Sequence, residues 1–144
     1  MKPKNLSAGS TDLESCLIAG EEKALSLHME AYHRGDAIVL HCKGRIVFRD
    51  ETVALSRRVA ELLQRSQQLV LDLSGVKSID SAGLGQLVLL HMWAEGNRYS
   101  IKLASPTKRV HDLLEMTNVA SIFEIHNTVD GALNSPPSKV RRLA

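Results

Sequence analysis

Residues 69–86, LVLDLSGVKSIDSAGLGQ, join the clearest buried-strand pattern in the chain to a serine at the start of a helix. The apolar run at 69–73 contains three leucines and one valine, and Ser74 and Gly75 close it. Such a run is typical of a strand covered on both faces. Ser81 precedes an apolar helical pattern, and serine is a preferred N-cap residue. We therefore expect a central strand, a turn, and a helix capped by Ser81, whose hydroxyl faces solvent.

Strand and helix patterns alternate along the rest of the chain. Residues 25–32 alternate strictly between apolar and polar side chains, and a turn at 34–36 leads to a more buried strand at 37–42, which predicts an antiparallel hairpin. The other expected elements are, in order, an edge strand at 45–48, a helix from about 50 to 63, the strand and helix quoted above, a strand at 101–104, a helix opened by Pro106, a strand at 122–125 and a helix at 128–133. Alternating strands and helices imply parallel pairing, so we predict a single α/β domain with a mixed sheet and crossover helices packed against it.

Apolar positions predict which helix faces are buried. They are Val53, Leu55, Val59, Leu62 and Leu63 in the helix that begins near residue 50, and Val110, Leu113, Leu114 and Met116 in the helix after Pro106. The middle helix runs to about residue 95. Gly96 and Asn97 follow it, which predicts a left-handed C-terminal stop.

Composition places boundaries at both ends of this domain. The chain has 144 residues, which is enough for one domain with a proper core. Residues 1–24 are polar and mixed, and we expect a flexible N-terminal extension there. Residues 25–133 form the predicted domain. Residues 134–144 contain two prolines and then three positive charges, which indicates a basic C-terminal tail.

Composition also excludes several function classes. A net charge of +2 and 3% aromatic residues argue against direct nucleic-acid binding. No apolar run approaches the ~18 residues of a membrane-spanning helix, so we expect no membrane association. Cys16 and Cys42 lack the spacing of a disulfide framework, which predicts a reduced, cytoplasmic protein. The six histidines lack metal-site spacing, and Gly83 and Gly85 lack the third glycine of a nucleotide loop, so we expect no metal and no cofactor.

The segment DSAGLG at residues 80–85 carries a family resemblance. Together with the strand LVLDLSGV and the order of elements, it resembles a STAS domain of the anti-sigma factor antagonist type. The resemblance covers about residues 25–133, with weaker agreement at Gly44 and at residues 104–106. It implies a STAS-like fold, and it implies that the partner-binding residues are Asp80, Ser81, Ala82, Gly83, Leu84 and Gly85.

The resemblance further implies a protein-binding module rather than an enzyme. The unphosphorylated domain would sequester a cognate anti-sigma factor, a serine kinase of the ATPase type, and so free a sigma factor for transcription. Phosphorylation of Ser81 would release that partner, and a phosphatase would restore binding. The resemblance leaves the oligomeric state open.

The chain departs from the family pattern at two positions. Many antagonists carry an acidic residue about two positions after the glycine that matches Gly44, whereas this chain has Arg45, Ile46 and Val47 there. Ala82 stands where serine or threonine is common, so no second hydroxyl lies beside Ser81. The extension at 1–24 lies outside the pattern and has no assigned role.

A phosphate on Ser81 would act mainly through its charge. Phosphoserine carries roughly −1.5 to −2 charges, and a helix N-terminus tolerates negative charge because of its dipole and free amides. A partner that buried the phosphate beside Asp80 would have to desolvate it against a second negative group. We therefore expect phosphorylation to abolish binding at little cost to stability.

Two other interpretations remain open. In the first, Ser81 is only a helix cap, and the chain is a constitutive STAS adaptor in a signalling or lipid-transport assembly. In the second, Ser81 is the nucleophile of a serine hydrolase, with Asp112 and His126 as acid and base. A nucleophile elbow requires glycine two positions before the serine, and Ile79 occupies that position.

Overall fold

The structure, a computed structural model, describes residues 26–136 and contains a five-stranded sheet. The strands are β2 (Leu27–Arg34), β3 (Ala37–Ile46), β4 (Gln68–Ile79), β5 (Ser100–Ala104) and β6 (Ile125–His126), in the spatial order β2-β3-β4-β5-β6. β2 pairs with β3 antiparallel, and every other pair is parallel. The predicted mixed sheet is confirmed, with β4 at its centre.

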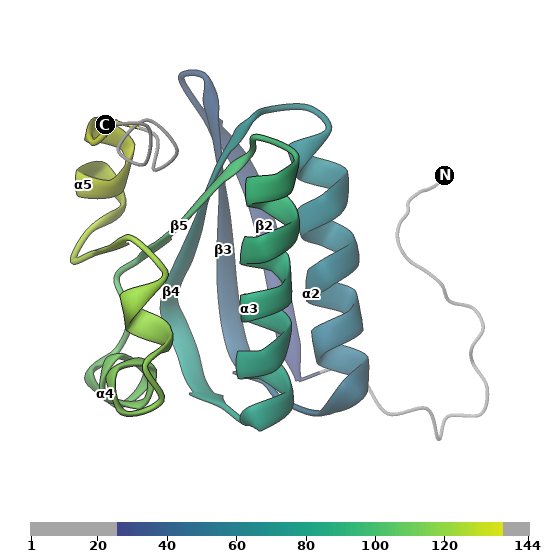
Figure 1. Cartoon of the computed structure of the whole chain (residues 1–144), viewed down its shortest axis with the longest axis vertical. Helices are drawn as coiled ribbons and strands as arrows, with labels where there is room; N and C mark the ends of the chain where they lie inside the picture. Colours follow the sequence, from purple (N-terminus) through teal and green to yellow (C-terminus); the bar gives the residue numbers. More distant parts are fainter. Residues whose placement is uncertain (1–25, 137–144) are drawn as a thin grey trace.

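Helices cover both faces of this sheet (Figure 1). They are α2 (Phe48–Leu63), α3 (Ser81–Gly96), α4 (Lys108–Met116) and α5 (Val129–Asn134), with a 3-10 turn at Val119–Ser121. Figure 1 shows α2 and α3 side by side on one face and α5 on the opposite side of the sheet. The predicted order of strands and crossover helices is therefore confirmed. None of the helices within residues 26–136 has the length and apolarity needed to cross a membrane.

The core follows the two-sided character of the central strand. Leu69, Leu71 and Leu73 belong to the large cluster that packs under α2, α3 and α4. Val70 faces the other way and joins a small cluster with Val39, Ala104 and Ala132, which lies under α5. β4 is thus buried on both faces, as its continuous apolar run predicts.

Two strands differ from their predicted bounds. β3 does not stop before Gly44; it continues through a bulge with φ +115° at this glycine, and Arg45 and Ile46 pair with Ser78 and Ile79 of β4. The predicted edge strand at 45–48 is therefore wrong, and α2 begins at Phe48. The predicted strand at 122–125 is wrong except at Ile125, because β6 is Ile125–His126 and the 3-10 turn at Val119–Ser121 extends to a C-cap at Ile122.

Two residues predicted to face the core are exposed. Val53 on α2 is 43% exposed and Met116, in the last turn of α4, is 82% exposed. The predicted left-handed stop at Gly96 and Asn97 is displaced by the structure. Gly96 is still helical, and the residue with a positive φ, 65°, is Arg98. Val53 and Met116 each lie two positions from a buried leucine, Leu55 and Leu114, which is about 200° around the helix, so both side chains point away from the core.

The two proposed terminal segments lie largely outside the described residues.

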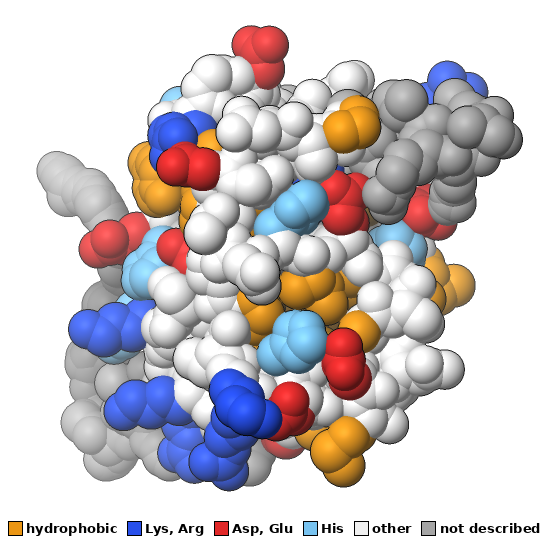
Figure 2. Space-filling view, turned by 90° about the vertical axis from the view of Figure 1, so that its left-hand side faces the viewer, with side chains coloured by type: hydrophobic (Ala, Val, Ile, Leu, Met, Phe, Trp, Pro, Cys, Tyr) orange, Lys and Arg blue, Asp and Glu red, His pale blue; other side chains and the backbone are white. Residues whose placement is uncertain are grey.

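Positive side chains gather at one end of the described domain: Figure 2 shows Lys and Arg clustered at the lower left of the face that carries α4 and α5. This is the end at which β4 passes into α3.

Candidate functional site

Asp80, and not Ser81, is the N-cap of α3. Its backbone is extended, its side-chain Oδ1 accepts a hydrogen bond from the amide of Gly83 at 2.9 Å, and its carbonyl accepts one from the amide of Leu84 at 2.9 Å. The amide of Asp80 donates to the carbonyl of Ile46 at 3.3 Å, which ties the junction to the end of β3. The expectation that Ser81 caps the helix is therefore wrong; aspartate is an equally good cap and lies one residue earlier.

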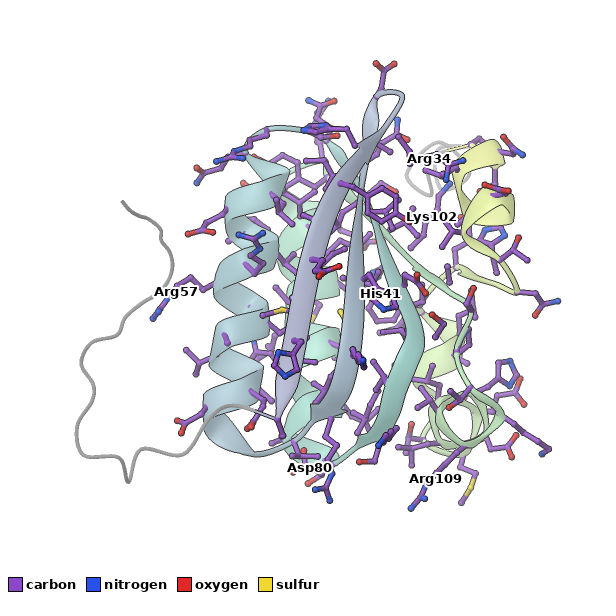
Figure 3. All side chains as sticks on the ribbon, turned by 180° about the vertical axis from the view of Figure 1, so that it is seen from behind. Arg34, His41, Arg57, Asp80, Lys102 and Arg109 are labelled. Carbon is purple, nitrogen blue, oxygen red and sulfur yellow. The ribbon has the colours of Figure 1, made fainter. Side chains whose placement is uncertain are left out.

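Ser81 is the first residue of α3 and is exposed to solvent. Within residues 26–136 its hydroxyl makes no hydrogen bond, because Asp80 supplies the capping oxygen. Figure 3 shows Asp80 at the tip of the molecule where α3 begins. The serine is thereby displayed on a rigid support and takes no part in holding the helix.

Asp80 is half-buried, and the other five residues of the DSAGLG segment divide into two groups. Ser81, Ala82 and Gly85 are exposed, whereas Gly83 and Leu84 are buried. A Cβ at Gly83 would collide with the carbonyl oxygen of Ile46, so this glycine allows α3 to lie directly against the end of β3. A Cβ at Gly85 would meet nothing within 4 Å. The exposed group offers contacts to a partner, and the buried group sets the position of the helix.

A surface pocket of about 300 Å³ adjoins this junction. It lies between the end of β4, at Ser78 and Ile79, and the face of α4 that carries Arg109, Leu113 and Met116. The pocket mixes apolar side chains with one cation, Arg109, and one carboxylate, Asp112, so it suits mainly an apolar side chain.

The residues considered for a hydrolase do not gather around Ser81. Asp112 accepts a hydrogen bond from Lys108 at 2.8 Å on the surface of α4. His126 Nε2 lies 2.6 Å from the carboxylate of Glu124. Neither makes a hydrogen bond to Ser81 within the described part of the chain, and this part also contains no group of three or more His, Cys, Asp or Glu residues placed to hold a metal ion.

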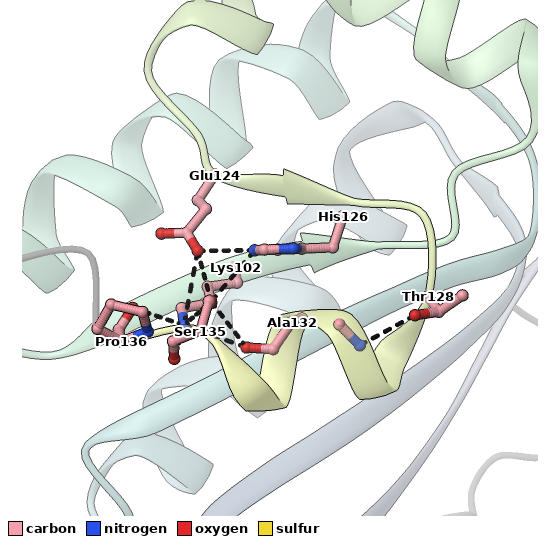
Figure 4. Close-up of polar contacts among 8 residues, drawn as sticks. Lys102, Glu124, His126, Thr128, Ala132, Ser135 and Pro136 are labelled. Atoms are coloured by element: carbon pink, nitrogen blue, oxygen red, sulfur yellow. Dashed lines mark hydrogen bonds and ion pairs between the residues drawn. The ribbon is translucent and has the colours of Figure 1, made fainter.

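Sequence reasoning missed a buried lysine that holds α5. The side chain of Lys102 on β5 is 4% exposed. Its Nζ donates to the carbonyls of Ala132, Ser135 and Pro136 at 3.1, 2.8 and 2.8 Å, and it lies 3.6 Å from the carboxylate of Glu124 (Figure 4). Lys102 therefore binds the C-terminal carbonyls of α5. A lysine inside the apolar run IKLA was the available signal.

Comparisons with known proteins agree with this architecture. The family model for the STAS domain matches residues 28–132. The chain belongs to the STAS domain family. This family assignment matches the resemblance carried by residues 80–85 and covers the whole sheet.

Solved STAS structures share the fold at low sequence identity. An anti-sigma factor antagonist from Mycobacterium paratuberculosis is 20% identical with a TM-score of 0.67, over 81% of this chain and 95% of that chain. The anti-sigma factor antagonist SpoIIAA of Bacillus in its unphosphorylated form is 12% identical with a TM-score of 0.62, over 81% of this chain and 99% of that chain. The STAS domain of a SulP transporter from Vibrio cholerae is 14% identical with a TM-score of 0.55, over 78% and 87%.

These three likenesses concern the fold, which serves both anti-sigma factor antagonists and a domain of a transporter. The activity of this STAS domain must therefore be argued from its own site.

Proposed function

We propose that this STAS domain is an anti-sigma factor antagonist switched by phosphorylation of Ser81. In the unphosphorylated state it binds and sequesters a cognate anti-sigma factor, a serine kinase of the ATPase type, in the cytoplasm. Phosphorylation of Ser81 by that kinase releases the anti-sigma factor, and removal of the phosphate by a phosphatase restores binding. The domain acts by binding and regulates transcription through its partner, without catalysis of its own.

The exposed, unengaged hydroxyl of Ser81 is the observation that carries the proposal. Asp80 satisfies the amide of Gly83, so modification of Ser81 removes no hydrogen bond that holds α3. The amides of Ser81 and Ala82 belong to the first turn, where no intrahelical acceptor exists, and they lie beside the position of the phosphate. The dipole of α3 favours negative charge at the same place. The fold therefore accommodates the phosphorylated state.

The same site has little side-chain bulk above the helix. Ala82 carries one methyl group, and Gly85 carries no side chain and lies in open space. A partner backbone or the active site of a kinase can thus approach the first turn of α3 closely. A dianion on Ser81 would lie inside that contact, next to the carboxylate of Asp80, and its desolvation would oppose binding.

The first experiment identifies the modified residue. The purified domain is incubated with ATP and the ATPase-type serine kinase from the same source, and phosphopeptides are mapped by mass spectrometry. We expect one phosphate, on Ser81, and none on the Ser81→Ala variant. Ser78→Ala, which changes the half-buried serine at the end of β4, is the matched control and should be phosphorylated like the wild type. Phosphate on other residues alone would refute the proposal.

The second experiment measures the switch by calorimetry with the same kinase. We expect Ser81→Ala to bind with wild-type affinity and Ser81→Asp to bind at least tenfold more weakly, which corresponds to about 1.4 kcal/mol. Ser74→Asp places the same charge at an exposed position of β4 and should bind like the wild type. Equal affinities of Ser81→Ala and Ser81→Asp would instead favour a constitutive adaptor.

A further inference from the structure

Four exposed cations surround the end of the sheet next to α3. We call them the basic rim: Lys43, Arg45, Lys77 and Arg109. Pairing of β3 with β4 places Lys43 opposite Gly75 and Arg45 opposite Ser78, so Lys77 lies between them along the neighbouring strand. Arg109 lines the pocket together with Ser78. Figure 3 shows Arg109 at the same end of the molecule as Asp80.

Acidic groups on this end are already engaged. Within residues 26–136 none of the four rim side chains makes an ion pair. Asp80 caps α3, Asp112 pairs with Lys108, and Glu51 accepts hydrogen bonds from Ser26. Hydrogen bonds from uncharged donors do not cancel the charges of Asp80 and Glu51, so the four rim cations exceed these two carboxylates by about two positive charges, which remain available to an acidic ligand.

The described domain begins at this rim. The carbonyl of Ser26 accepts a hydrogen bond from the amide of Arg45 at 2.8 Å, and the amide and hydroxyl of Ser26 donate to Glu51 at 2.8 Å each. The residues that precede Ser26 in the chain are consequently attached beside Arg45. Five residues span at most about 17 Å, so Glu21 and Glu22 have the reach to contact the rim.

The sequence before Ser26 complements the rim in charge and polarity. Residues 11–24, TDLESCLIAGEEKA, contain four carboxylates and one lysine. Between the two acidic pairs lie Leu13, Leu17 and Ile18, with Cys16 among them. The carboxylates match the cations of the rim, and the apolar side chains match a pocket bordered by Ile79, Leu113 and Met116.

We propose that residues 11–24 bind in cis across the basic rim, with Glu21 and Glu22 on the cations and an apolar side chain in the adjoining pocket. A short tether gives an effective concentration in the millimolar range, so a weak contact is well populated. The bound segment competes with an acidic partner for the rim. This consequence for a partner rests on the proposed function, whereas the docking does not.

Cys16 allows a direct test, because the other thiol is inert. Cys42 is fully buried, and its burial, together with Asp72, raises the pKa of its thiol to about 12. A nitroxide spin label added at neutral pH therefore reacts with Cys16. In the full ¹⁵N-labelled chain we expect the nitroxide to broaden the amide signals of residues 77–85 and 109–116. The reference spectrum is that of the same sample after the nitroxide has been chemically reduced to its diamagnetic form. The broadening should fall at least twofold in 0.5 M NaCl, since salt screens exposed charges.

Charge-reversal variants separate this docking from non-specific contact. Arg45→Glu/Arg109→Glu and Glu21→Lys/Glu22→Lys should each abolish the selective broadening, and the two pairs combined should restore it. Arg57→Glu/Arg65→Glu changes two exposed arginines of α2 by the same charge and should leave the broadening unchanged. Figure 3 shows Arg57 on the outer side of α2, away from Arg109.

Two results would overturn the proposal. One is broadening that is spread evenly over the surface or is indifferent to the charge reversals at the rim. The other comes from a mixture of two chains, one carrying the spin label but no ¹⁵N and one carrying ¹⁵N but no spin label. Equal broadening in this mixture would show that the segment binds to a second copy of the chain. No kinase or anti-sigma factor is present in this experiment. A negative result would therefore refute the docking of residues 11–24 without bearing on the Ser81 switch. Likewise, a negative result in the kinase experiments would refute the switch without bearing on the docking.

Discussion

Asp80 and Ser81 are neighbours with separate roles at the start of α3. Asp80 holds the first turn through its hydrogen bond to Gly83, whereas the Ser81 side chain faces solvent. This division lets a charge change on Ser81 leave the helix intact. It also makes the stability effect of each residue measurable by itself.

We expect Asp80→Ala to lower the free energy of unfolding by about 1 kcal/mol, the usual cost of a lost N-cap. Ser81→Ala should change it by less than about 0.5 kcal/mol, because an exposed side chain without a contact is removed. Urea denaturation measures both. Asp80→Asn is the control, since asparagine caps as well as aspartate. An equal loss for Ser81→Ala and Asp80→Ala would contradict the cap assignment.

The two glycines of the first turn should respond oppositely to alanine. Gly83→Ala forces a methyl group against the carbonyl of Ile46, and overpacking of this kind costs about 1–3 kcal/mol. Gly85→Ala places the same methyl group in open space and should stabilise α3 by about 0.5–1 kcal/mol through helix propensity. Thermal unfolding of both variants checks the prediction. A stabilising Gly83→Ala would show that α3 does not lie directly on β3.

At the scale of elements, α5 depends on one side chain of β5. It has six residues, and its apolar contacts are limited to the small cluster of Ala132 with Val39, Val70 and Ala104, against which Val129 and Leu133 also pack. The ammonium of Lys102 closes the C-terminal end of α5, where carbonyls lack intrahelical donors. Thr128 closes the other end by accepting a hydrogen bond from the amide of Gly131 at 2.9 Å.

Replacing Lys102 with methionine should therefore release α5 and destabilise the domain. We expect a loss of about 3 kcal/mol, because the buried carboxylate of Glu124 loses its cation. Hydrogen exchange followed by mass spectrometry should show faster exchange in residues 129–136 than in α3. Lys108→Met removes an exposed lysine with one surface ion pair and should cost less than about 0.5 kcal/mol. Equal hydrogen-exchange rates in α5 of the Lys102→Met and Lys108→Met variants would contradict the conclusion that Lys102 holds α5.

At the scale of the whole molecule, the apolar core disfavours ionisation of the Cys42 thiol buried in it. Cys42 lies at the centre of β3, and burial, with Asp72 as a smaller contributor, raises the pKa of its thiol from 9.0 to about 12. Unfolding exposes the thiol and lets it ionise at lower pH. Its contribution to stability is therefore fully present below pH 9 and is lost as the pH rises towards 12.

The free energy of unfolding should thus fall more steeply with pH in the wild type than in Cys42→Ala. Between pH 9 and 11 we expect the difference between the two proteins to change by up to about 1.4 kcal/mol per pH unit. Urea titrations at several pH values measure it, and groups common to both proteins cancel. A constant difference over this range would show that the thiol ionises as readily in the folded state as in the unfolded state.

Much of this molecule could be predicted from local patterns. The apolar run at 69–73 identified β4, the turn around Gly35 identified the hairpin, and Thr128 identified the start of α5. The cap was misassigned by one residue because aspartate and serine have nearly equal capping preference. The burial of Val53 and Met116 was misjudged because their apolar character was given more weight than their position, which is about 200° around the helix from Leu55 and Leu114.

The sequence by itself determined the order of elements, the mixed sheet and the serine at the start of α3, since these follow from periodicity and turn chemistry within short windows. Only the tertiary structure decided that Asp80 caps the helix, that Gly83 is buried while Gly85 is open, and that Lys43, Arg45, Lys77 and Arg109 share one surface. Those features involve residues up to 66 positions apart in the chain, such as Lys43 and Arg109, which the pairing of β3 with β4 and the packing of α4 bring to one end of the sheet. Strand pairing and helix packing bring such residues together, and no local pattern encodes that proximity.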